Sequence, residues 1–497
     1  MKYIRILKYR YSLIVKYAGV IIMGAGVALL TPLLSLFLYS NEADQIKYFV
    51  IPAILALITG AIFYLTMKRP ETELNLTLKE GAVIVVFSWM IVTIFFSLPF
   101  IFGLGMNFTN SIFEAVSGIT TTGLSVVDVT KVPKIYLLWR SIMQFLGGAG
   151  LAVIALSSIL PMQGMGLYEA EGRTDQLLPH VRKTTSMIVQ IYVGYVIAGI
   201  ILYVLTGMTF FDAVNHSIAA VSTGGFSTVP ESIGYWNSLP LELATIILMI
   251  FGTMNFATSY TLLKGKYKRF FANGEIKLLF FLIGIFTPLV AFVSLNGLYN
   301  SLGEAFRQSL FQMVTALSTT GFSTIDFNTW PYFANFVILI FMIIGGGTGS
   351  TAGGIKQFRV FLVFKSIYWK IKQRFRPRNE IQENYIWRGE EKWYIKDNHI
   401  RDAANYIILY LFTYLIGVLI FLAHDYSLHD SLFEFASALG TVGLSVGVTA
   451  ADAPKLILWT ETIGMFLGRL EIFVIFYALI KIFRDGIYVR KKKKQTK

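Results

Sequence analysis

The feature of this sequence that most constrains its fold is a series of long apolar stretches. Of the 497 residues, 55% are hydrophobic and only 14% are charged. A soluble chain of this length would need a larger share of polar residues for its surface. Several of the apolar stretches reach the roughly 20 residues that a helix needs to cross the hydrocarbon core of a bilayer. The sequence therefore predicts an all-α, polytopic membrane protein.

Hydropathy places ten candidate spans along the chain, two at the start and then four pairs. They cover approximately residues 12–39, 48–67, 81–104, 135–160, 184–206, 240–263, 277–296, a run from 333 onward, 404–423 and 455–483.

Each of the four pairs encloses a similar stretch rich in Thr, Ser and Gly. The pattern Gly-[Leu/Phe]-Ser recurs at Gly123, Gly225, Gly321 and Gly443, and a polar insert at about 366–402 lengthens the last interval. Repetition of this kind indicates one structural unit used four times. The predicted division is 1–80 for two N-terminal transmembrane helices, 81–183 for repeat 1, 184–276 for repeat 2, 277–402 for repeat 3 with the insert, and 403–497 for repeat 4 with a basic tail.

The net charge of +14 is concentrated beside the apolar spans. A strongly basic protein could bind nucleic acid. The clusters at 264–269, 374–378 and 490–494 all flank candidate spans, however, as the positive-inside rule describes for cytoplasmic segments. With ten spans, both termini and the basic loops fall on that side. The sequence contains no cysteine, which excludes disulfides, thiolate metal sites and cysteine catalysis.

The segments before the four glycine-containing loops predict a cation pathway. Segments such as 112–119 and 432–439 make two to three helical turns, too few to cross a bilayer. They must re-enter the membrane, where irregular backbone is tolerated only inside protein or around water. Four such helices can direct their partially negative C-terminal ends toward one axis. Glycine permits the positive φ values that aim successive carbonyl oxygens at an ion and replace its hydration shell.

Three further motifs, together with the four loops, resemble one known family. The motifs are 144–156 (QFLGGAGLAVIAL), 345–356 (GGGTGSTAGGIK) and 464–473 (GMFLGRLEIF). Over nearly its whole length, the sequence resembles the membrane subunit of bacterial Trk-type potassium uptake systems (TrkH/TrkG-like), within the Trk/Ktr/HKT superfamily. The two leading spans favour Trk over Ktr, whose members resemble the eight-span core alone.

This resemblance implies a single-chain pore of four M1–pore helix–M2 repeats that carries out potassium uptake across the bacterial inner membrane. It implies K+ as the transported ion, no organic cofactor in this chain and no enzymatic activity. It also implies a homodimer in membrane lipid, with a TrkA-type cytosolic nucleotide-binding regulatory ring as a partner and no nucleic acid.

The resemblance also assigns a selectivity filter, with three residues from each repeat. They are Thr121, Thr122 and Gly123; Thr223, Gly224 and Gly225; Thr319, Thr320 and Gly321; and Thr441, Val442 and Gly443. In this family a serine in place of the first filter glycine accompanies sodium preference in some plant members. All four positions are glycine here, which favours potassium. Because Gly224 and Val442 replace threonine, a sodium or mixed sodium/potassium transporter, with or without proton coupling, stays open as the alternative.

A second glycine-rich segment interrupts the second span of repeat 3. Its match to the dinucleotide fingerprint G-x-G-x-x-G/A lacks a βαβ context and a downstream acidic residue, so a nucleotide-binding membrane enzyme is disfavoured. A hinge or a packing role is the simpler interpretation. By family position the loop lies below the filter and gates it, and Arg469, expected inside the final span, repels cations or braces the loop. The predicted gate residues are Gly345, Gly346, Gly347, Gly349, Gly353, Gly354 and Arg469.

Two further observations limit the range of mechanisms. His216 lies in the second short helix and is expected to be packed and hydrogen-bonded, because the five histidines are scattered and form no metal constellation. No relay of carboxylates is apparent inside the apolar spans, which favours a gated channel over a proton-coupled carrier. The sequence leaves that choice open.

Overall fold

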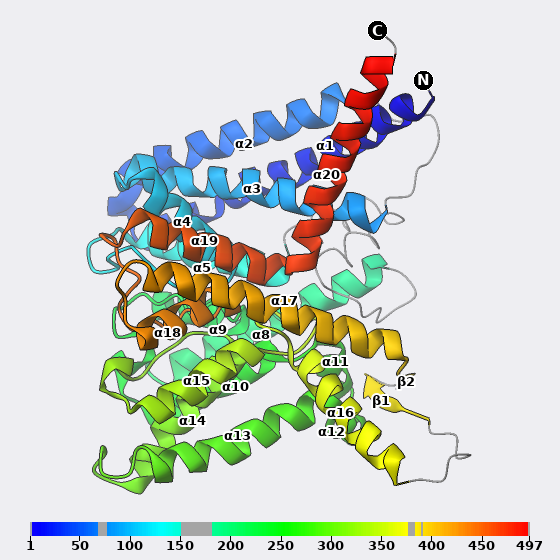
Figure 1. The fold of residues 1–497 in the computed structure, drawn as a ribbon. Coiled ribbons are helices and arrows are strands. Elements are labelled where there is room, and N and C mark those ends of the chain that lie inside the picture. Colours follow the sequence, from blue (N-terminus) through cyan, green and yellow to red (C-terminus); the bar gives the residue numbers. More distant parts are fainter. Residues whose placement is uncertain (1, 68–76, 151–180, 376–382, 389–390, 496–497) are drawn as a thin grey trace. The chain divides into compact units, whose positions relative to one another are not determined.

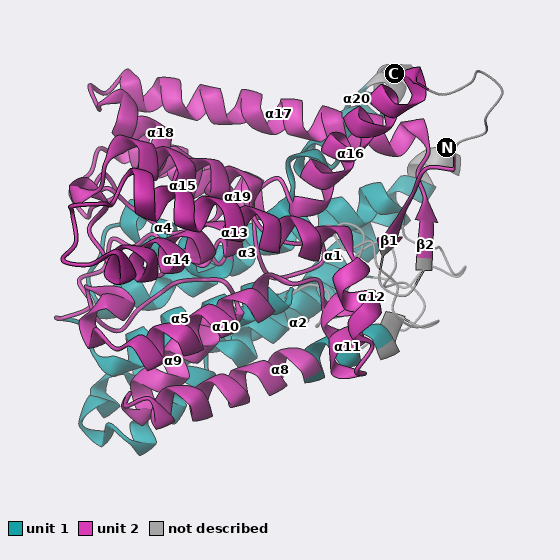
Figure 2. Cartoon of the chain, turned by 90° about the horizontal axis from the view of Figure 1, so that it is seen from below, with its two compact units in different colours: residues 1–119, 131–190, 470–497 teal, residues 120–130, 191–469 magenta. Residues whose placement is uncertain are grey.

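The computed structural model describes residues 2–67, 77–150, 181–375, 383–388 and 391–495, and these residues are mainly helical (Figure 1). They form two compact units, which Figure 2 distinguishes by colour. Unit 1 comprises Met1–Ile119, Lys131–Gln190 and Leu470–Lys497. Unit 2 comprises Thr120–Thr130 and Ile191–Arg469.

Unit 1 is built from long helices of the two chain ends. Its described elements are α1 (Lys2–Ala28), the 3-10 helices η1 (Thr31–Phe37) and η2 (Ser40–Gln45), α2 (Ile46–Thr66), α3 (Leu78–Gly103), α4 (Phe108–Ile119), α5 (Lys134–Ala149), the start of α8 (Val181–Leu205), and α20 (Ile472–Gln495). Helices α1 and α2 approach closely at Gly19 and Gly60, where a Cβ atom on either glycine would meet the backbone of the other helix. Small residues at such crossings let apolar helices pack in a bilayer, where lipid offers no hydrophobic driving force.

A buried carboxylate joins three of these helices near the basic chain ends. Glu80 completes a capping box with Thr77 at the start of α3, and its side chain is 2% exposed. Its Oε1 accepts a hydrogen bond from Arg10 of α1 at 2.6 Å. Lys481 of α20 lies 4.0 Å from the same carboxylate and 3.0 Å from Asp485. This ion-pair network fixes the N- and C-terminal helices of unit 1 to α3.

Unit 2 contains most of the remaining chain. Its elements are the rest of α8, α9 (Phe210–Val221), η3 (Ser232–Trp236), α10 (Leu239–Thr253), α11 (Phe256–Leu263), α12 (Tyr267–Ala272), α13 (Gly274–Val293), α14 (Leu302–Ser318), η4 (Phe327–Thr329), α15 (Tyr332–Ile344), α16 (Gln357–Arg374), β1 (Tyr385–Arg388), β2 (Glu391–Tyr394), α17 (Asp397–Leu422), α18 (Leu428–Gly440) and α19 (Lys455–Leu470). The two strands pair antiparallel, with Tyr385 opposite Tyr394, so the predicted polar insert contains a β-hairpin.

The predicted fold class, an all-α polytopic membrane protein, is confirmed. Six helices in the described residues are long and apolar enough to cross a membrane, or eight if each of two broken helix pairs forms one span. Of the remaining two expected spans, the one at 135–160 runs into residues 151–160, which lie outside the described part of the chain. The other is the 13-residue helix α15, which ends where the glycine-rich segment begins.

Two spans that hydropathy predicted as continuous are broken, and those predictions were wrong. The predicted span 240–263 bends by 116° between α10 and α11. There the side chain of Asn255 caps α11 by accepting from the N–H of Ala257. The predicted span 455–483 ends one helix at Leu470 and starts another at Ile472, with Glu471 at φ 62° between them. The division into four repeats stays a prediction.

Candidate cation site

The three residues predicted from each repeat, called here the four triplets, lie at the C-terminal ends of short helices. These helices are longer than predicted: α4 and α9 have 12 residues, α18 has 13 and α14 has 17. All are still shorter than a membrane span. The whole of the first triplet belongs to the segment 120–130, so all four triplets lie within unit 2.

The backbone of the triplets alternates in the sign of φ. The first residue of each is a threonine in the left-handed region: Thr121, Thr223, Thr319 and Thr441 have φ between 50° and 55°. The third is a glycine: Gly123, Gly225, Gly321 and Gly443 have φ between 72° and 97°. The middle residues are not among those with positive φ. A non-glycine residue rarely adopts positive φ, so four threonines in this state indicate a backbone held by its surroundings.

Hydrogen bonds to the preceding helix hold this backbone in three of the repeats. The N–H of each middle residue donates to the carbonyl five residues earlier, as at a Schellman helix end. The pairs are Gly224 to Ala219 at 2.8 Å, Thr320 to Thr315 at 3.0 Å and Val442 to Ser437 at 2.9 Å. Because these amides bond back to the helix, the carbonyl oxygens are the backbone groups left to face the neighbouring triplets.

The four triplets form a closed ring. At every triplet glycine, an added Cβ atom would collide with a carbonyl oxygen of the next triplet. The contacting pairs are Gly123 with Gly224, Gly225 with Thr320, Gly321 with Val442, and Gly443 with Thr122. The last pair returns to the first triplet. A side chain at any of these four positions would therefore displace a carbonyl of the ring.

The glycine loop, residues 345–356, lies against one end of this ring. It is non-helical and connects α15 to α16. The N–H of Gly353 donates to Thr319 Oγ1 at 2.8 Å, and a Cβ atom on Gly353 would meet Thr441 Oγ1. Thr351 Oγ1 lies 3.2 Å from Thr223 Oγ1. All three contacts involve the first residue of a triplet, so the loop covers the end of the ring nearest the short helices.

The other end of the glycine loop is fixed by groups from neighbouring helices. Glu275 on α13 accepts from the N–H of Thr348 at 2.7 Å, and Asn255 donates to the Thr348 carbonyl. The N–H of Gly347 donates to the Thr253 carbonyl at 3.0 Å. The break between α10 and α11 thus supplies partners for the loop. Helices flank the loop on both sides, which is not the strand–turn–helix context of a dinucleotide site.

Arg469 reaches the same loop. It lies at the end of α19, one residue before the helix terminates, and its guanidinium donates a hydrogen bond to the carbonyl of Thr351. Its expected place inside a continuous span was wrong, because α19 ends at Leu470. The predicted contact between Arg469 and the glycine loop is present in this geometry. Whether Arg469 also faces permeating ions stays a prediction.

Stiffening the glycine loop is expected to change gating. A Cβ atom at Gly346 would collide with Thr253 and Ala352, and one at Gly347 would approach the Thr253 carbonyl. The double substitution Gly346→Ala, Gly347→Ala should therefore shift the loop and alter the open probability in single-channel recordings. Gly284→Ala is the control, because a Cβ there meets nothing within 4 Å. Recordings in which the double variant matches the parent would count against a gating role.

A polar residue lies nine positions before each triplet glycine, and sequence reasoning singled out only one of the four. They are Glu114, His216, Gln312 and Glu434. As expected, His216 is buried and hydrogen-bonded: Nε2 lies 3.0 Å from Ser227 Oγ and Nδ1 2.9 Å from the Asp212 carbonyl. Gln312 donates to Thr324 Oγ1 at 2.9 Å. The constant nine-residue offset was the signal that could have found them. No group of three metal-ligating side chains occurs among the described residues.

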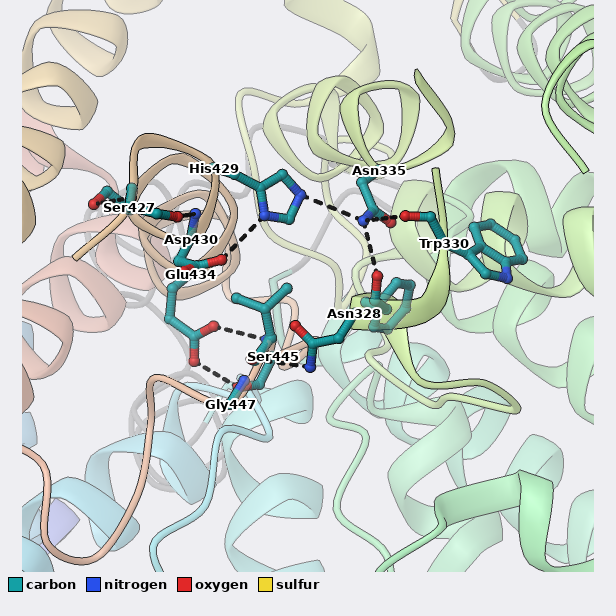
Figure 3. A network of polar contacts seen from close by, with 12 residues as sticks. Asn328, Trp330, Asn335, Ser427, His429, Asp430, Glu434, Ser445 and Gly447 are labelled. Atoms are coloured by element: carbon teal, nitrogen blue, oxygen red, sulfur yellow. Dashed lines mark hydrogen bonds and ion pairs between the residues drawn. The ribbon is translucent and has the colours of Figure 1, made fainter. Parts of the chain in front are cut away.

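Three of these polar residues bond to the chain just after a triplet, and the carboxylate of Glu434 does so most extensively. It turns toward Ser445 in Figure 3 and accepts from Ser445 Oγ at 2.6 Å and from the N–H of Val446 at 3.0 Å. Asn328, from the segment after the third triplet, donates to the Val446 carbonyl at 3.3 Å. These bonds join the post-triplet segments of repeats 3 and 4.

Glu114 instead forms a buried ion pair with Arg140 of α5. Arg140 Nε donates to Glu114 Oε1 at 2.7 Å, and the side chains are 3% and 0% exposed. Arg140→Ala would leave a buried carboxylate without this cation, which typically destabilises a protein by about 3–5 kcal/mol. We expect a clearly lower unfolding temperature in detergent. Arg140→Lys keeps the charge and should lose less, and an Arg140→Ala protein as stable as the parent would contradict this assignment.

Comparison with known proteins agrees with this geometry. The family described as TrkH, a cation transport protein, matches residues 45–491. Trk system potassium uptake protein TrkG of Escherichia coli K12 is 31% identical over 92% of this chain and 95% of its own length. An "uncharacterized cation transporter" of Methanocaldococcus jannaschii is 30% identical over 95% of this chain and 96% of its own.

A solved structure extends the likeness to the fold. The crystal structure of the potassium transporter TrkH from Vibrio parahaemolyticus superposes with a TM-score of 0.81, at 27% identity, over 95% of this chain and 98% of that one. The matched proteins are transport proteins, as the sequence predicted for a chain that is not an enzyme. The chain belongs to the TrkH family of cation transport proteins, as a Trk-type potassium uptake membrane subunit.

Proposed function

We propose that this protein conducts K+ across the membrane through the ring of four triplets. The observation that carries the proposal is the closed ring, in which each glycine abuts a carbonyl of the next triplet. Rings of backbone carbonyls can replace the hydration shell of a cation. The buried hydroxyls of Thr121 and Thr441 have no hydrogen-bond partner in the structure. Buried polar groups normally find a partner, and a dehydrated cation would supply one.

The four glycines favour K+ over Na+ on this site. None carries a side chain that would displace a carbonyl of the next triplet. Gly224 and Val442 lack the hydroxyl that threonine supplies at the middle position of the other two triplets. This asymmetry supports the second candidate, a mixed sodium/potassium transporter on the same scaffold. The membrane potential supplies about 2.3 kcal/mol per elementary charge per 100 mV, enough to drive inward cation flow in either case.

The glycine loop is the proposed gate. It contacts three of the four triplets at the same end of the ring, and Arg469 and Glu275 hold it from different helices. A loop rich in glycine has many accessible backbone states, so a modest bias in free energy can shift its population. An ion leaving the ring on this side would have to pass the loop.

The charge distribution and the family together suggest how the protein is oriented and assembled in the membrane. The distribution of basic clusters supports a topology in which both termini and the β-hairpin lie on the cytoplasmic side of a bacterial inner membrane. A homodimer, regulated by a TrkA-type nucleotide-binding ring on that side, is the proposed assembly. Trk-system relatives among the matched proteins support this partner class.

Reconstituted flux tests the function directly. Purified protein in vesicles should take up K+ and Rb+ faster than Na+ and Li+, with an imposed potential and no cofactor. Repeating the measurement with a pH gradient separates a channel from a proton-coupled carrier. Equal uptake of all four ions would contradict the potassium assignment and favour the mixed transporter.

A further inference from the structure

The fourth repeat carries a glutamate where the first repeat carries the arginine of its buried ion pair. Glu461 lies six residues after the lysine that begins α19, as Arg140 does in α5. Seven residues further on, both helices have a glycine, Gly147 and Gly468. A Cβ atom on either glycine would collide with a carbonyl near the C-terminal end of the preceding short helix. The two helices therefore share a register, and Glu461 replaces Arg140.

Glu434, the counterpart of Glu114, is fully bonded as an anion. Its Oε1 accepts from Ser445 Oγ at 2.6 Å, from the N–H of Thr449 at 3.0 Å and from Thr449 Oγ1 at 2.5 Å. Its Oε2 accepts from the N–H of Val446 at 3.0 Å. Four donors around two oxygens match the acceptor-only character of an ionised carboxylate. A proton on Glu434 would compete with these donors.

Glu461 has the opposite environment. Its side chain is fully buried, its Oε2 has no hydrogen-bond partner, and its Oε1 lies 2.9 Å from Thr449 Oγ1. Thr449 has one hydroxyl hydrogen, and its shorter contact, with Glu434 Oε1, uses it. An ionised Glu461 would therefore be a buried anion without a single donor, an arrangement that costs too much free energy to persist. Only a hydrogen on Glu461 itself completes the contact with Thr449.

We propose that Glu434, Thr449 and Glu461 form a proton-binding site, in which Glu461 carries the proton and donates it to Thr449 Oγ1. Thr449 in turn donates to the anionic Glu434. The bound proton takes the place of the fixed positive charge of Arg140 in the first repeat. The proton reduces the total charge of Glu434 and Glu461 from −2 to −1.

The surroundings offer no other counter-charge. In the described part of the chain, no Lys, Arg or His lies within ion-pair distance of either carboxyl. Among the described residues, the phenol of Tyr426, which precedes α18, interacts with both carboxyl groups, and it also interacts with Asp452, which precedes α19. Neither is a cation at neutral pH. Loss of the proton would therefore place two uncompensated anions on either side of Thr449.

The position of the site gives the proton a consequence, which rests on the function proposed above. Thr449, Val446 and Ser445 belong to the segment that follows the fourth triplet, and Glu434 holds all three. If Glu461 were ionised, its carboxylate would repel that of Glu434, and this repulsion would loosen the segment that follows the fourth triplet. We therefore expect ion flux to fall at alkaline pH in the parent, and to fall less in Glu461→Gln, whose amide can donate to Thr449 at every pH.

Infrared spectroscopy of the full-length protein in lipid tests the proton without any transport assay. The parent should show the carbonyl-stretch band of a protonated, buried carboxylic acid, and Glu461→Gln should lose it. Glu114→Gln is the matched control, because Glu114 is ionised beside Arg140 and its replacement should leave the band in place. If Glu114→Gln does not fold, Glu242→Gln serves as the control. Glu242 also pairs with an arginine, because Arg307 donates to both of its oxygens at 2.7 Å.

The outcomes separate this proposal from the proposed function. A parent-minus-Glu461→Gln spectrum containing only bands of an ionised carboxylate would overturn the proton site, whatever the flux. Glu461→Arg, which rebuilds the ion pair of the first repeat, should fold and also lack the acid band. If the acid band is present but neither the parent nor any variant conducts K+, the proton site stands and the transport proposal fails.

Discussion

Gly123→Ser is expected to remove most of the preference for K+ over Na+. A Cβ atom at this position would collide with the Gly224 carbonyl, and Gly123 itself has φ +94°. Holding a non-glycine residue in such a conformation costs about 1–3 kcal/mol. Each 1.4 kcal/mol is about a tenfold change in an equilibrium constant. The serine should therefore move the Gly224 carbonyl and change relative ion uptake by about tenfold or more, measured as initial rates into vesicles under an imposed potential.

Gly207→Ser separates a disturbed ring from a general loss of stability. Gly207 has φ +104°, but nothing lies within 4 Å of a Cβ atom built on it. It carries a similar backbone cost without a neighbouring carbonyl, so its selectivity should match the parent. If the two serine variants had the same relative uptake of K+ and Na+, the ring would not be the site of selection.

The glycines of the triplets could be located in the sequence because their backbone chemistry is local, whereas the assignment of the triplets as a filter came from the family resemblance and stays a prediction. Positive φ at the third position requires glycine in every repeat, so Gly123, Gly225, Gly321 and Gly443 recur where the backbone needs them. The left-handed threonine before each was not foreseen, because threonine has no preference for that conformation. Tertiary contacts impose it, and these are invisible in a one-dimensional pattern.

Hydropathy could not locate the helix breaks, because it averages over a window of residues and contains no information on the direction of the backbone. The residues around Asn255 are as apolar as a continuous span, yet the asparagine caps a new helix and bonds to the glycine loop. The short helices were underestimated for the opposite reason. The segments predicted at 112–119 and 432–439 left out polar first turns, because α4 begins at Phe108 and α18 at Leu428.

The buried carboxyl groups near the fourth triplet were missed because each looks unremarkable in the sequence of its own repeat. Glu434 is the one acidic residue of the predicted short segment 432–439, and Glu461 is one of two, with Glu471, in the predicted span 455–483. Only the fold brings both within reach of Thr449. No carboxylate relay was apparent along the sequence, because the two carboxyl groups come together only in the three-dimensional structure.

Arg469→Ala is expected to increase K+ flux. The guanidinium donates to the Thr351 carbonyl, and the Thr351 hydroxyl in turn contacts the second triplet at Thr223. A hydrogen bond from a charged donor contributes about 1.5–3 kcal/mol. If this bond holds the loop across the end of the ring, its loss should raise the open population by about tenfold or more. Single-channel recording gives the open probability directly, and vesicle uptake gives the resulting flux.

Two further variants distinguish bracing from charge repulsion at this position. Arg469→Gln keeps a hydrogen-bond donor and removes the charge, whereas Arg469→Lys keeps the charge and loses the planar fork of donors. Bracing predicts that glutamine stays closer to the parent than alanine does, because the glycine loop keeps a partner. Charge repulsion predicts that glutamine and alanine increase flux equally and that lysine does not. Lower flux in Arg469→Ala at normal expression would contradict both, because it would make the arginine a support for the open state.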